Sequence, residues 1–278
     1  MVEQSEDIGF KKIELEALIK SKNPALLKVI PRFVLKKLKR ILHLDEVNTI
    51  LQENYKEDPY TFIEKGLAMF GAKIVVEGTG NLPDKKRLLF VANHPLGGLD
   101  GLVFMKTIHD IYGDLRFPVN DFLLNLPSLK QIFLPINKHG AHSRDSFQAI
   151  DQAYRSELPI LYFPAGLCSR KIKGKIVDLE WKRSVVTSAI KHQRDVVPVF
   201  IQGRNSNFFY NLANLRKTLR IKGNIEMLYL VDEMFNQKGQ QIVIRFGKPI
   251  PWETFNNTKS TTEWTDFVRQ KTYEMEYL

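Results

Sequence analysis

One histidine and one aspartate of this chain stand in a setting that suits proton transfer. His94 lies three residues after the apolar run 88–91, which is typical of a buried strand, and Asp100 begins a helical pattern six positions later. Two adjacent glycines, Gly97 and Gly98, lie between them. Because open α/β sheets carry their chemistry at the carboxyl ends of strands, we expect both side chains at that edge. An imidazole held by a carboxylate can take a proton from a hydroxyl, so we predict a general base.

The residues around His94 resemble the first motif of the glycerolipid (PlsC-like) acyltransferases, in which Asn-His-Pro is followed by an aspartate. Asn93, His94 and Pro95 match it, although five residues, rather than the family's usual four, separate the histidine from Asp100. Three weaker blocks of that family follow in the same order: Pro135-Ile136-Asn137-Lys138, Phe163-Pro164-Ala165-Gly166-Leu167-Cys168-Ser169 and Val197-Pro198-Val199. The resemblance covers roughly residues 75 to 205.

The resemblance implies an enzyme that moves an acyl chain from a thioester to the hydroxyl of a lipid. His94 would take the proton from that hydroxyl while its oxygen attacks the thioester, and Asp100 would hold the ring. An acyl-carrier-protein or coenzyme A thioester would be the co-substrate, and we expect no metal, no further cofactor and no covalent enzyme intermediate. The backbone N–H groups near Gly97 and Gly98 could stabilise the oxyanion. A hydrolase that uses water as acceptor fits the same two residues.

Several motif residues are expected to bind substrate or to support the loops that do so: Asn93, Gly97, Gly98, Lys138, Phe163, Pro164, Ala165, Gly166, Ser169 and Arg170. In the family, a glutamate and an arginine of the third block are associated with the polar acceptor, often its glycerol phosphate. Here these positions hold Ala165 and Cys168. A phosphate needs fixed positive charge or a cluster of donors, and neither side chain offers that.

We therefore expect an acceptor other than glycerol phosphate. The lineage that this variant block resembles O-acylates lyso forms of amino-acid lipids, such as ornithine or glycine lipids. The alternative within the same chemistry is lysophosphatidic acid, a 1-acylglycerol-3-phosphate, with Arg170, Lys171 or Lys138 supplying the missing charge.

Other reactive side chains give weaker signals. The single cysteine, Cys168, excludes an intrachain disulfide and a zinc-binding spacing, and we expect a small buried side chain rather than a nucleophile. His139 and His142 are too few for a metal site. The triplet 181–183, Trp-Lys-Arg, either helps to bind an anionic donor or marks a helix that begins at the surface.

The net charge of +10 predicts an anionic partner, either an acidic membrane surface or nucleic acid. Residues 20–40 carry eight Lys or Arg and no acidic residue, and apolar residues recur there at three- and four-residue steps. Such a segment can lie in a membrane interface, although its apolar stripe could equally pack on the domain. Considered with the resemblance, it predicts a peripheral protein on the cytoplasmic face of the inner membrane. A basic nucleic-acid-binding module is the rival class, but its characteristic motifs are missing, so we expect no nucleic acid.

The chain has no apolar run near the ~20 residues that a spanning helix needs and no recognisable signal peptide. From residue 72 onward, short apolar runs alternate with helical patterns, which predicts an α/β fold with a largely parallel central sheet flanked by helices. We divide the chain into an N-terminal helical, membrane-associating segment, 1–71, and an acyltransferase domain, 72–278. Strands are expected at 73–77, 87–92, 116–119, 132–136, 160–163, 196–201, 225–231 and 241–246, the last two paired antiparallel at an edge.

Overall fold

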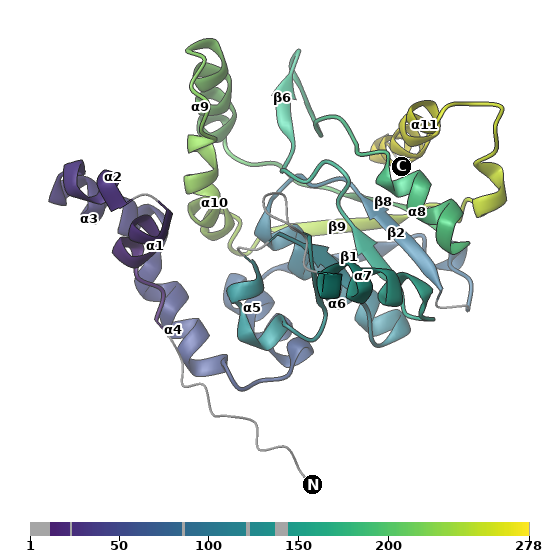
Figure 1. Cartoon of the computed structure of the whole chain (residues 1–278), viewed down its shortest axis with the longest axis horizontal. Helices are drawn as coiled ribbons and strands as arrows, with labels where there is room; N and C mark the ends of the chain where they lie inside the picture. The colour runs from purple at the N-terminus through teal and green to yellow at the C-terminus, as the bar shows by residue number, and fades with distance from the viewer. Residues whose placement is uncertain (1–11, 23, 85–86, 121–122, 137–143, 278) are drawn as a thin grey trace, which may run out of the picture.

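The structure, a computed structural model, describes residues 12–22, 24–84, 87–120, 123–136 and 144–277. A five-stranded sheet in the order β1-β9-β8-β2-β5 crosses the molecule, and the helices α1 to α3 stand off to one side (Figure 1). The strands of this sheet are β1 (Lys73–Glu77), β2 (Leu88–Ala92), β5 (Ile160–Tyr162), β8 (Asp195–Ile201) and β9 (Gln241–Phe246).

The strand directions bring three carboxyl ends to one edge of the sheet. β2 lies between β5 and β8 and is parallel to both, and β1 is parallel to β9. The pair β8 and β9 is antiparallel. The predicted α/β class with a largely parallel sheet is therefore confirmed, and the segments that follow β2, β5 and β8 leave the sheet side by side.

Strand β2 is buried along its whole length because helices cover both faces of the sheet. Leu88, Phe90 and Ala92 pack on one side with the helices α5 (Pro59–Phe70) and α6 (Gly98–Tyr112). Leu89 and Val91 pack on the other side with α7 (Arg144–Arg155), α8 (Ser184–His192) and α11 (Thr261–Glu274). A strand covered on both faces contains apolar residues without alternation, which is why the continuous apolar run at 88–92 predicts a buried strand.

Residues 225–231 do not form the predicted strand, and that prediction was wrong. They form a 3-10 turn, η4 (Ile225–Tyr229), followed by the helix α10 (Leu230–Asn236). Leu230 and Met234, four residues apart, both pack on the glycine turn after β2, which requires helical rather than extended spacing. The antiparallel neighbour of β9 is consequently β8.

Two smaller strand pairs lie outside the main sheet. β3 (Phe117–Val119) and β4 (Phe133–Pro135) pair in parallel, close to their predicted ranges. β6 (Arg170–Ile172) and β7 (Lys175–Val177) form a hairpin that the sequence did not predict. Its strands are short and rich in lysine, so neither the length nor the composition is typical of a strand.

The N-terminal segment contains α1 (Leu15–Lys22), α2 (Pro24–Val29), α3 (Arg32–Ile41) and α4 (Leu44–Asn54), followed by α5. α4 and α5 are separate helices because Asp58 caps α5 and Pro59 opens it. α5 buries its apolar face in the same core as the sheet. The core is thus continuous across the boundary placed at residue 71.

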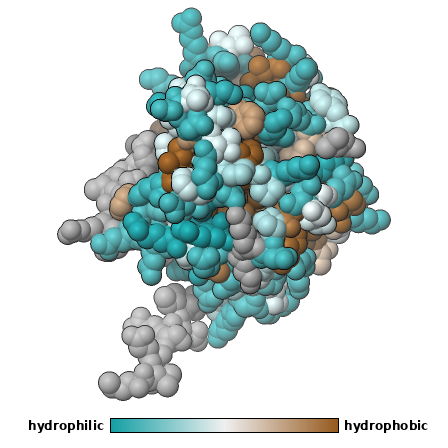
Figure 2. All heavy atoms as spheres, turned by 90° about the vertical axis from the view of Figure 1, so that its right-hand side faces the viewer, coloured by the Kyte–Doolittle hydropathy of each residue, from teal (hydrophilic) through white to brown (hydrophobic). Residues whose placement is uncertain are grey.

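No helix among the described residues has the length and apolar content to cross a bilayer. α3 contains no fully buried residue. Figure 2 shows the side of the molecule that lies away from α1 to α3, which is the right-hand side of Figure 1, where α8 and α11 lie. That face is mainly hydrophilic, and its apolar groups are small and separated.

Candidate active site

The segments that follow β2, β5 and β8 meet at one edge of the sheet and form the candidate site. The first carries His94, the second carries Phe163, and the third carries Asn205. Asn205 donates from its side-chain amide to the carbonyl of Pro95, 3.3 Å away, and so joins the first segment to the third. The parallel sheet therefore assembles the site from residues that are far apart in the sequence.

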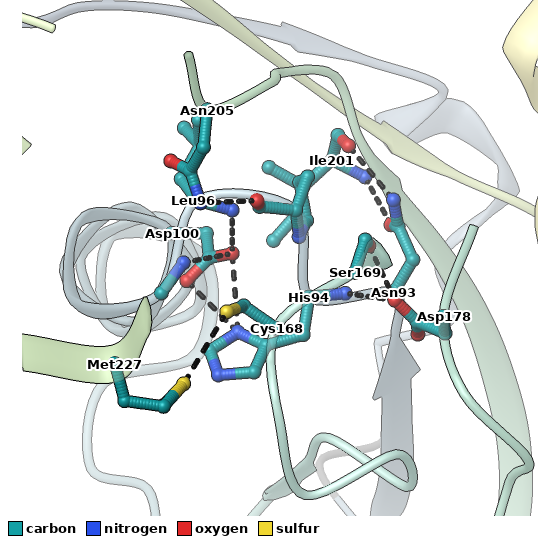
Figure 3. Close-up of polar contacts among 12 residues, drawn as sticks. Asn93, His94, Leu96, Asp100, Cys168, Ser169, Asp178, Ile201, Asn205 and Met227 are labelled. Carbon is teal, nitrogen blue, oxygen red and sulfur yellow. Dashed lines mark hydrogen bonds and ion pairs between the residues drawn. The ribbon is translucent and has the colours of Figure 1, made fainter. Parts of the chain in front are cut away.

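His94 and Asp100 form the predicted pair. The Nδ1 atom of His94 lies 3.0 Å and 3.1 Å from the two carboxylate oxygens of Asp100, and the other ring nitrogen, Nε2, points away from that carboxylate (Figure 3). The Asp100 side chain is fully buried, whereas 18% of the His94 side chain is exposed. The carboxylate also accepts the backbone N–H groups of Leu96 and Gly97, at 2.8 Å and 3.2 Å.

The glycine turn explains how a five-residue spacing still brings the pair together. Gly97 has φ 85° and ψ −116°, a conformation that residues with a Cβ rarely adopt. A Cβ on Gly98 would lie 2.5 Å from the Sδ atom of Met234, so the Met234 side chain on α10 would have to shift to admit any other residue. Because the N–H of Gly97 is bound to Asp100, that group is not free for the predicted oxyanion role. Gly98 lies in the first turn of α6, where N–H groups have no partner within the helix.

One face of the His94 ring packs against an aromatic residue of the third motif. Phe163 stacks on it with a centroid distance of 4.1 Å and an interplanar angle of 16°. Phe163 in turn contacts Phe104 and Phe117 in the core. Phe163 therefore supports the histidine ring, and its contact with substrate stays a prediction.

The backbone of His94 is held on both sides, by Ser169, which was expected to support the loop, and by Asp178, which the sequence analysis missed. The N–H of Ser169 donates to the carbonyl of His94 at 2.7 Å, and the N–H of His94 donates to the carboxylate of Asp178 at 3.2 Å. Asp178 is almost fully buried and also accepts from the Ser169 hydroxyl and the Trp181 indole N–H. Burial raises the pKa of Asp178, although these hydrogen bonds oppose the rise.

Trp181 consequently lies in the interior rather than at a surface that could receive a donor. Its side chain is 3% exposed. Asp178 could not be found from the sequence because its partners are supplied by three separate segments, and an aspartate after a short polar strand is an ordinary turn residue.

Electrostatic contacts set the protonation of His94. Burial disfavours the charged ring, but the charge and hydrogen bond of Asp100 and the charge of Asp178 outweigh this, so that the pKa of His94 lies above its usual 6.5. Arg170 opposes the rise more weakly. A base with a raised pKa accepts a proton readily once it is neutral.

Asn93 serves as a support for the loop and does not face a ligand. Its side-chain amide donates to the carbonyl of Ile201 at 2.9 Å and accepts the N–H of the same residue at 2.7 Å. Asn93 is 3% exposed. The amide thus continues the pairing of β2 with β8 for one further step and fixes the point at which His94 leaves the sheet.

Arg170 is engaged in a buried cluster and cannot replace the family's phosphate-binding arginine. Its guanidinium lies 2.9 Å from a carboxylate oxygen of Glu226, and Arg216 approaches the other oxygen at the same distance. The side chain of Glu226 is fully buried. Arg170 also donates to the carbonyl and the sulfur of Cys168. The expectation that Arg170 contacts the acceptor is therefore corrected: its side chain is buried and bound to Glu226, a carboxylate that it shares with Arg216.

The remaining third-motif residues form a tight turn. The N–H of Gly166, which has φ 65°, donates to the carbonyl of Phe163, and the carbonyl of Pro164 accepts from Lys182. Ala165 packs on the core that α8 and α11 share. Lys138, with His139 and His142, lies outside the described residues.

Cys168 has the properties of a buried structural thiol. It is 1% exposed and belongs to a small core with Phe209 and Tyr210. Burial raises the pKa of the Cys168 thiol to about 11, so little thiolate is present near neutral pH. This agrees with the expectation that the residue is not a nucleophile.

Replacing Glu226 with glutamine is expected to lower the free energy of unfolding by about 3–5 kcal/mol, because Arg170 and Arg216 would be left buried beside a neutral group. Urea denaturation followed by circular dichroism measures the change. The exposed pair of Glu77 with Arg245 provides the control, and Glu77→Gln should cost at most about 1 kcal/mol. Equal, small effects of both changes would contradict the importance of the buried cluster.

Comparison with known proteins gives a consistent result. A protein-family model described as "Acyltransferase" matches residues 17–277. A protein of Phocaeicola vulgatus named "Lyso-glycine lipid O-acyltransferase" is 44% identical over 264 residues, which cover 95% of each chain. A protein of Bacteroides thetaiotaomicron with the same name is 42% identical over 264 residues, 95% of this chain and 97% of that one. A crystal structure of the 1-acyl-sn-glycerophosphate acyltransferase PlsC from Thermotoga maritima aligns with a TM-score of 0.49 at 16% identity, covering 94% of this chain and 92% of that one.

Proposed function

Since this chain belongs to the acyltransferase family, we propose that it is a lipid O-acyltransferase that acts on a lyso-amino-acid lipid, with lyso-glycine lipid as the leading acceptor. Relatives with that name match it over almost the whole of both chains. The observation that carries the proposal is the contact of His94 with the buried carboxylate of Asp100, 3.0 Å away. The arrangement supplies what hydroxyl activation needs, a base of fixed orientation with one nitrogen available.

In the proposed reaction, Nε2 of His94 takes the proton from the acceptor hydroxyl while the oxygen attacks the thioester carbonyl. The new C–O bond gives a tetrahedral oxyanion, for which the N–H of Gly98 is the candidate donor. Collapse of this intermediate breaks the C–S bond, and the imidazolium returns the proton to the leaving thiolate. Asp100 keeps Nδ1 protonated and stabilises the imidazolium. The donor would be an acyl-carrier-protein or coenzyme A thioester, with no further cofactor.

The acceptor is proposed from the charges around the site as well as from the relatives. Cys168 and Ala165 carry no charge, and Arg170 is paired with Glu226. A phosphate headgroup would therefore lack the fixed cation that the family's usual block supplies. Lysophosphatidic acid becomes the second candidate, and it would have to obtain its cation from elsewhere.

A competition assay tests the acceptor. Purified protein is given one acyl thioester together with lyso-glycine lipid, lyso-ornithine lipid and lysophosphatidic acid, and the products are separated by mass. We expect the diacylated glycine lipid to dominate. Phosphatidic acid as the main product would refute the proposed headgroup. Release of free fatty acid at the same rate without any lyso-lipid would instead indicate a hydrolase.

The N-terminal helices are proposed to attach the protein to the inner membrane from its cytoplasmic side. Val29 and Phe33 are 72% and 74% exposed, and Lys28, Arg32 and Lys36 lie among them. Exposed apolar side chains beside basic residues suit an anionic lipid interface, in which the apolar groups enter the acyl boundary. The lyso-lipid acceptor resides in such a membrane, so attachment would bring enzyme and acceptor together.

The pH dependence of the reaction follows from the raised pKa of His94. The ring must be neutral to accept a proton, and Asp100 and Asp178 favour its charged form. We expect kcat/KM to fall as the pH is lowered through a value above 6.5, and Asp178→Asn to move this acid limb to lower pH. The profile is measured with a dispersed acceptor at saturating thioester. An acid limb centred below 6.5 in the wild type would contradict the assignment.

A further inference from the structure

Helix α9 (Asn207–Thr218) carries apolar residues on two faces. The inner face is buried, whereas the outer face stays largely exposed, although Phe208 meets the ring of Tyr229 edge-on with a centroid distance of 4.9 Å. Phe209, Tyr210 and Ala213 are buried on the inner face. On the outer face, positions i, i+7 and i+11 lie on one side of the helix and carry exposed apolar side chains. Their exposed fractions are Phe208 52%, Leu215 55% and, at the C-cap, Leu219 60%. A soluble helix ordinarily presents polar residues on its outer face.

The outer face of α9 continues into other exposed apolar residues. Ile221 follows the helix and is 41% exposed, and Leu228 of η4 is also 41% exposed. The β6–β7 hairpin lies beside α9, since the amide of Asn214 reaches the carbonyl of Lys171 at 3.4 Å. Ile172 near the tip of this hairpin is 43% exposed. We call Ile172, Phe208, Leu215, Leu219 and Ile221 the α9 surface.

The two described segments that carry the α9 surface contain basic residues and no acidic ones. Between Phe208 and Ile225 the chain carries four Lys or Arg and no acidic residue: Arg216, Lys217, Arg220 and Lys222. The hairpin segment 168–177 carries four more, again with no acidic residue: Arg170, Lys171, Lys173 and Lys175. Only Arg170 and Arg216 among these pair with the buried Glu226. The exposed charge of these two segments is therefore positive.

We propose that the α9 surface is a second membrane-contact site, which inserts its apolar side chains into a bilayer containing anionic lipid. The apolar residues match the acyl boundary, and the surrounding lysines match anionic headgroups. An acidic carrier protein would pair with the lysines but would leave the exposed apolar side chains of α9 unburied. A nucleic acid would do the same.

The position of the α9 surface gives this contact a consequence for the reaction. The inner face of α9 shares a small core with Cys168, and Met227 and Leu230 pack against that core. Cys168 directly precedes Ser169, whose N–H donates to the carbonyl of His94, and the sulfur of Met227 lies 4.0 Å from that of Cys168 (Figure 3). Leu230 packs on Gly97. η4 packs against both α9 and α3. Insertion of both α3 and α9 would thus hold the bilayer over the edge of the sheet that carries the His94–Asp100 pair. This consequence for the reaction rests on the proposed function.

Vesicle sedimentation with the full chain tests the proposal. The probes are vesicles of phosphatidylcholine with phosphatidylglycerol and vesicles of phosphatidylcholine alone. Leu215→Asn/Leu219→Asn should weaken binding to the anionic vesicles on the order of tenfold or more. Lys217→Ser/Lys222→Ser should weaken it on the order of fivefold for each charge, and only at low salt. Ile190→Asn on the hydrophilic face and Lys130→Ser/Lys248→Ser are the matched controls and should bind like the wild type.

Two further measurements keep this test separate from the proposed function. Acyl transfer to a detergent-dispersed acceptor should be unchanged in the Leu215→Asn/Leu219→Asn variant, so a loss there would indicate damage to the fold or the site and overturn the assignment. Phe33→Asn, assayed in parallel, reports on α3 alone. Wild-type vesicle binding by both α9 variants would refute the second contact, whether or not the enzyme is active. A higher KM for an acyl-carrier-protein donor with unchanged vesicle binding would show that a protein docks there instead.

Discussion

Replacing His94 with alanine is expected to lower kcat by roughly 10²–10⁴-fold, which is the contribution typical of a general base. The loss should be this large because no other titratable group is seen bound to Asp100 among the described residues. His94 is partly exposed, so the change should leave the fold intact. Initial rates with an acyl thioester and lyso-glycine lipid, with circular dichroism of the same sample, measure both effects.

His109 provides the matched control for this change. It is a half-buried histidine on the same helix as Asp100, with its ring stacked on Tyr60. His109→Ala should therefore keep the catalytic rate of the folded protein. A folded His94→Ala variant with activity close to that of the wild type would show that the base lies elsewhere and would end the mechanism proposed above.

Asp100→Asn is expected to lower kcat on the order of 10⁴-fold, the effect typical of losing the aspartate that orients a catalytic histidine. The neutral amide cannot stabilise the imidazolium, and it can present its NH2 group rather than an oxygen to Nδ1 of His94. It also removes the charged acceptor of the N–H groups of Leu96 and Gly97. The rate is measured with the same substrates as for His94.

A second measurement separates this electrostatic role from simple loss of structure. Because Asp100 raises the pKa of His94, the residual activity of Asp100→Asn should show its acid limb at lower pH than in the wild type. Asp110→Asn, an exposed change on the same helix, should alter neither kcat nor the limb. An unshifted limb in a folded Asp100→Asn protein would mean that the carboxylate does not act on the histidine.

Much of the site could be predicted from the sequence because the signals are local. The apolar run 88–92 followed by His94, the glycine turn and Asp100 lies within a few residues, and the structure brings the pair within hydrogen-bond distance. The family resemblance, drawn from four blocks in order, is confirmed by the family match and by the relatives. The alternation of strands and helices likewise predicted the α/β sheet, since periodicity is a property of short segments.

Other features depended on partners that no local pattern contains. Arg170 looked available for a phosphate until the fold brought Glu226 to it from 56 residues away. The N–H of His94 is bound by Asp178, 84 residues away. The segment 225–231 has the composition of a strand, yet it is helical because Leu230 and Met234 must reach the glycine turn together.

Local sequence patterns were enough to predict the kind of fold, the acyltransferase family and the contact of His94 with Asp100, on which the proposed general base depends. Which charges are paired in the interior, and which side chains pack on the histidine, depended on the tertiary fold. Strand and helix periodicity is a property of neighbouring residues and can be recognised in a short segment. A buried charge, in contrast, must be matched by an opposite charge or a hydrogen-bonding group, which packing can bring from a distant part of the chain.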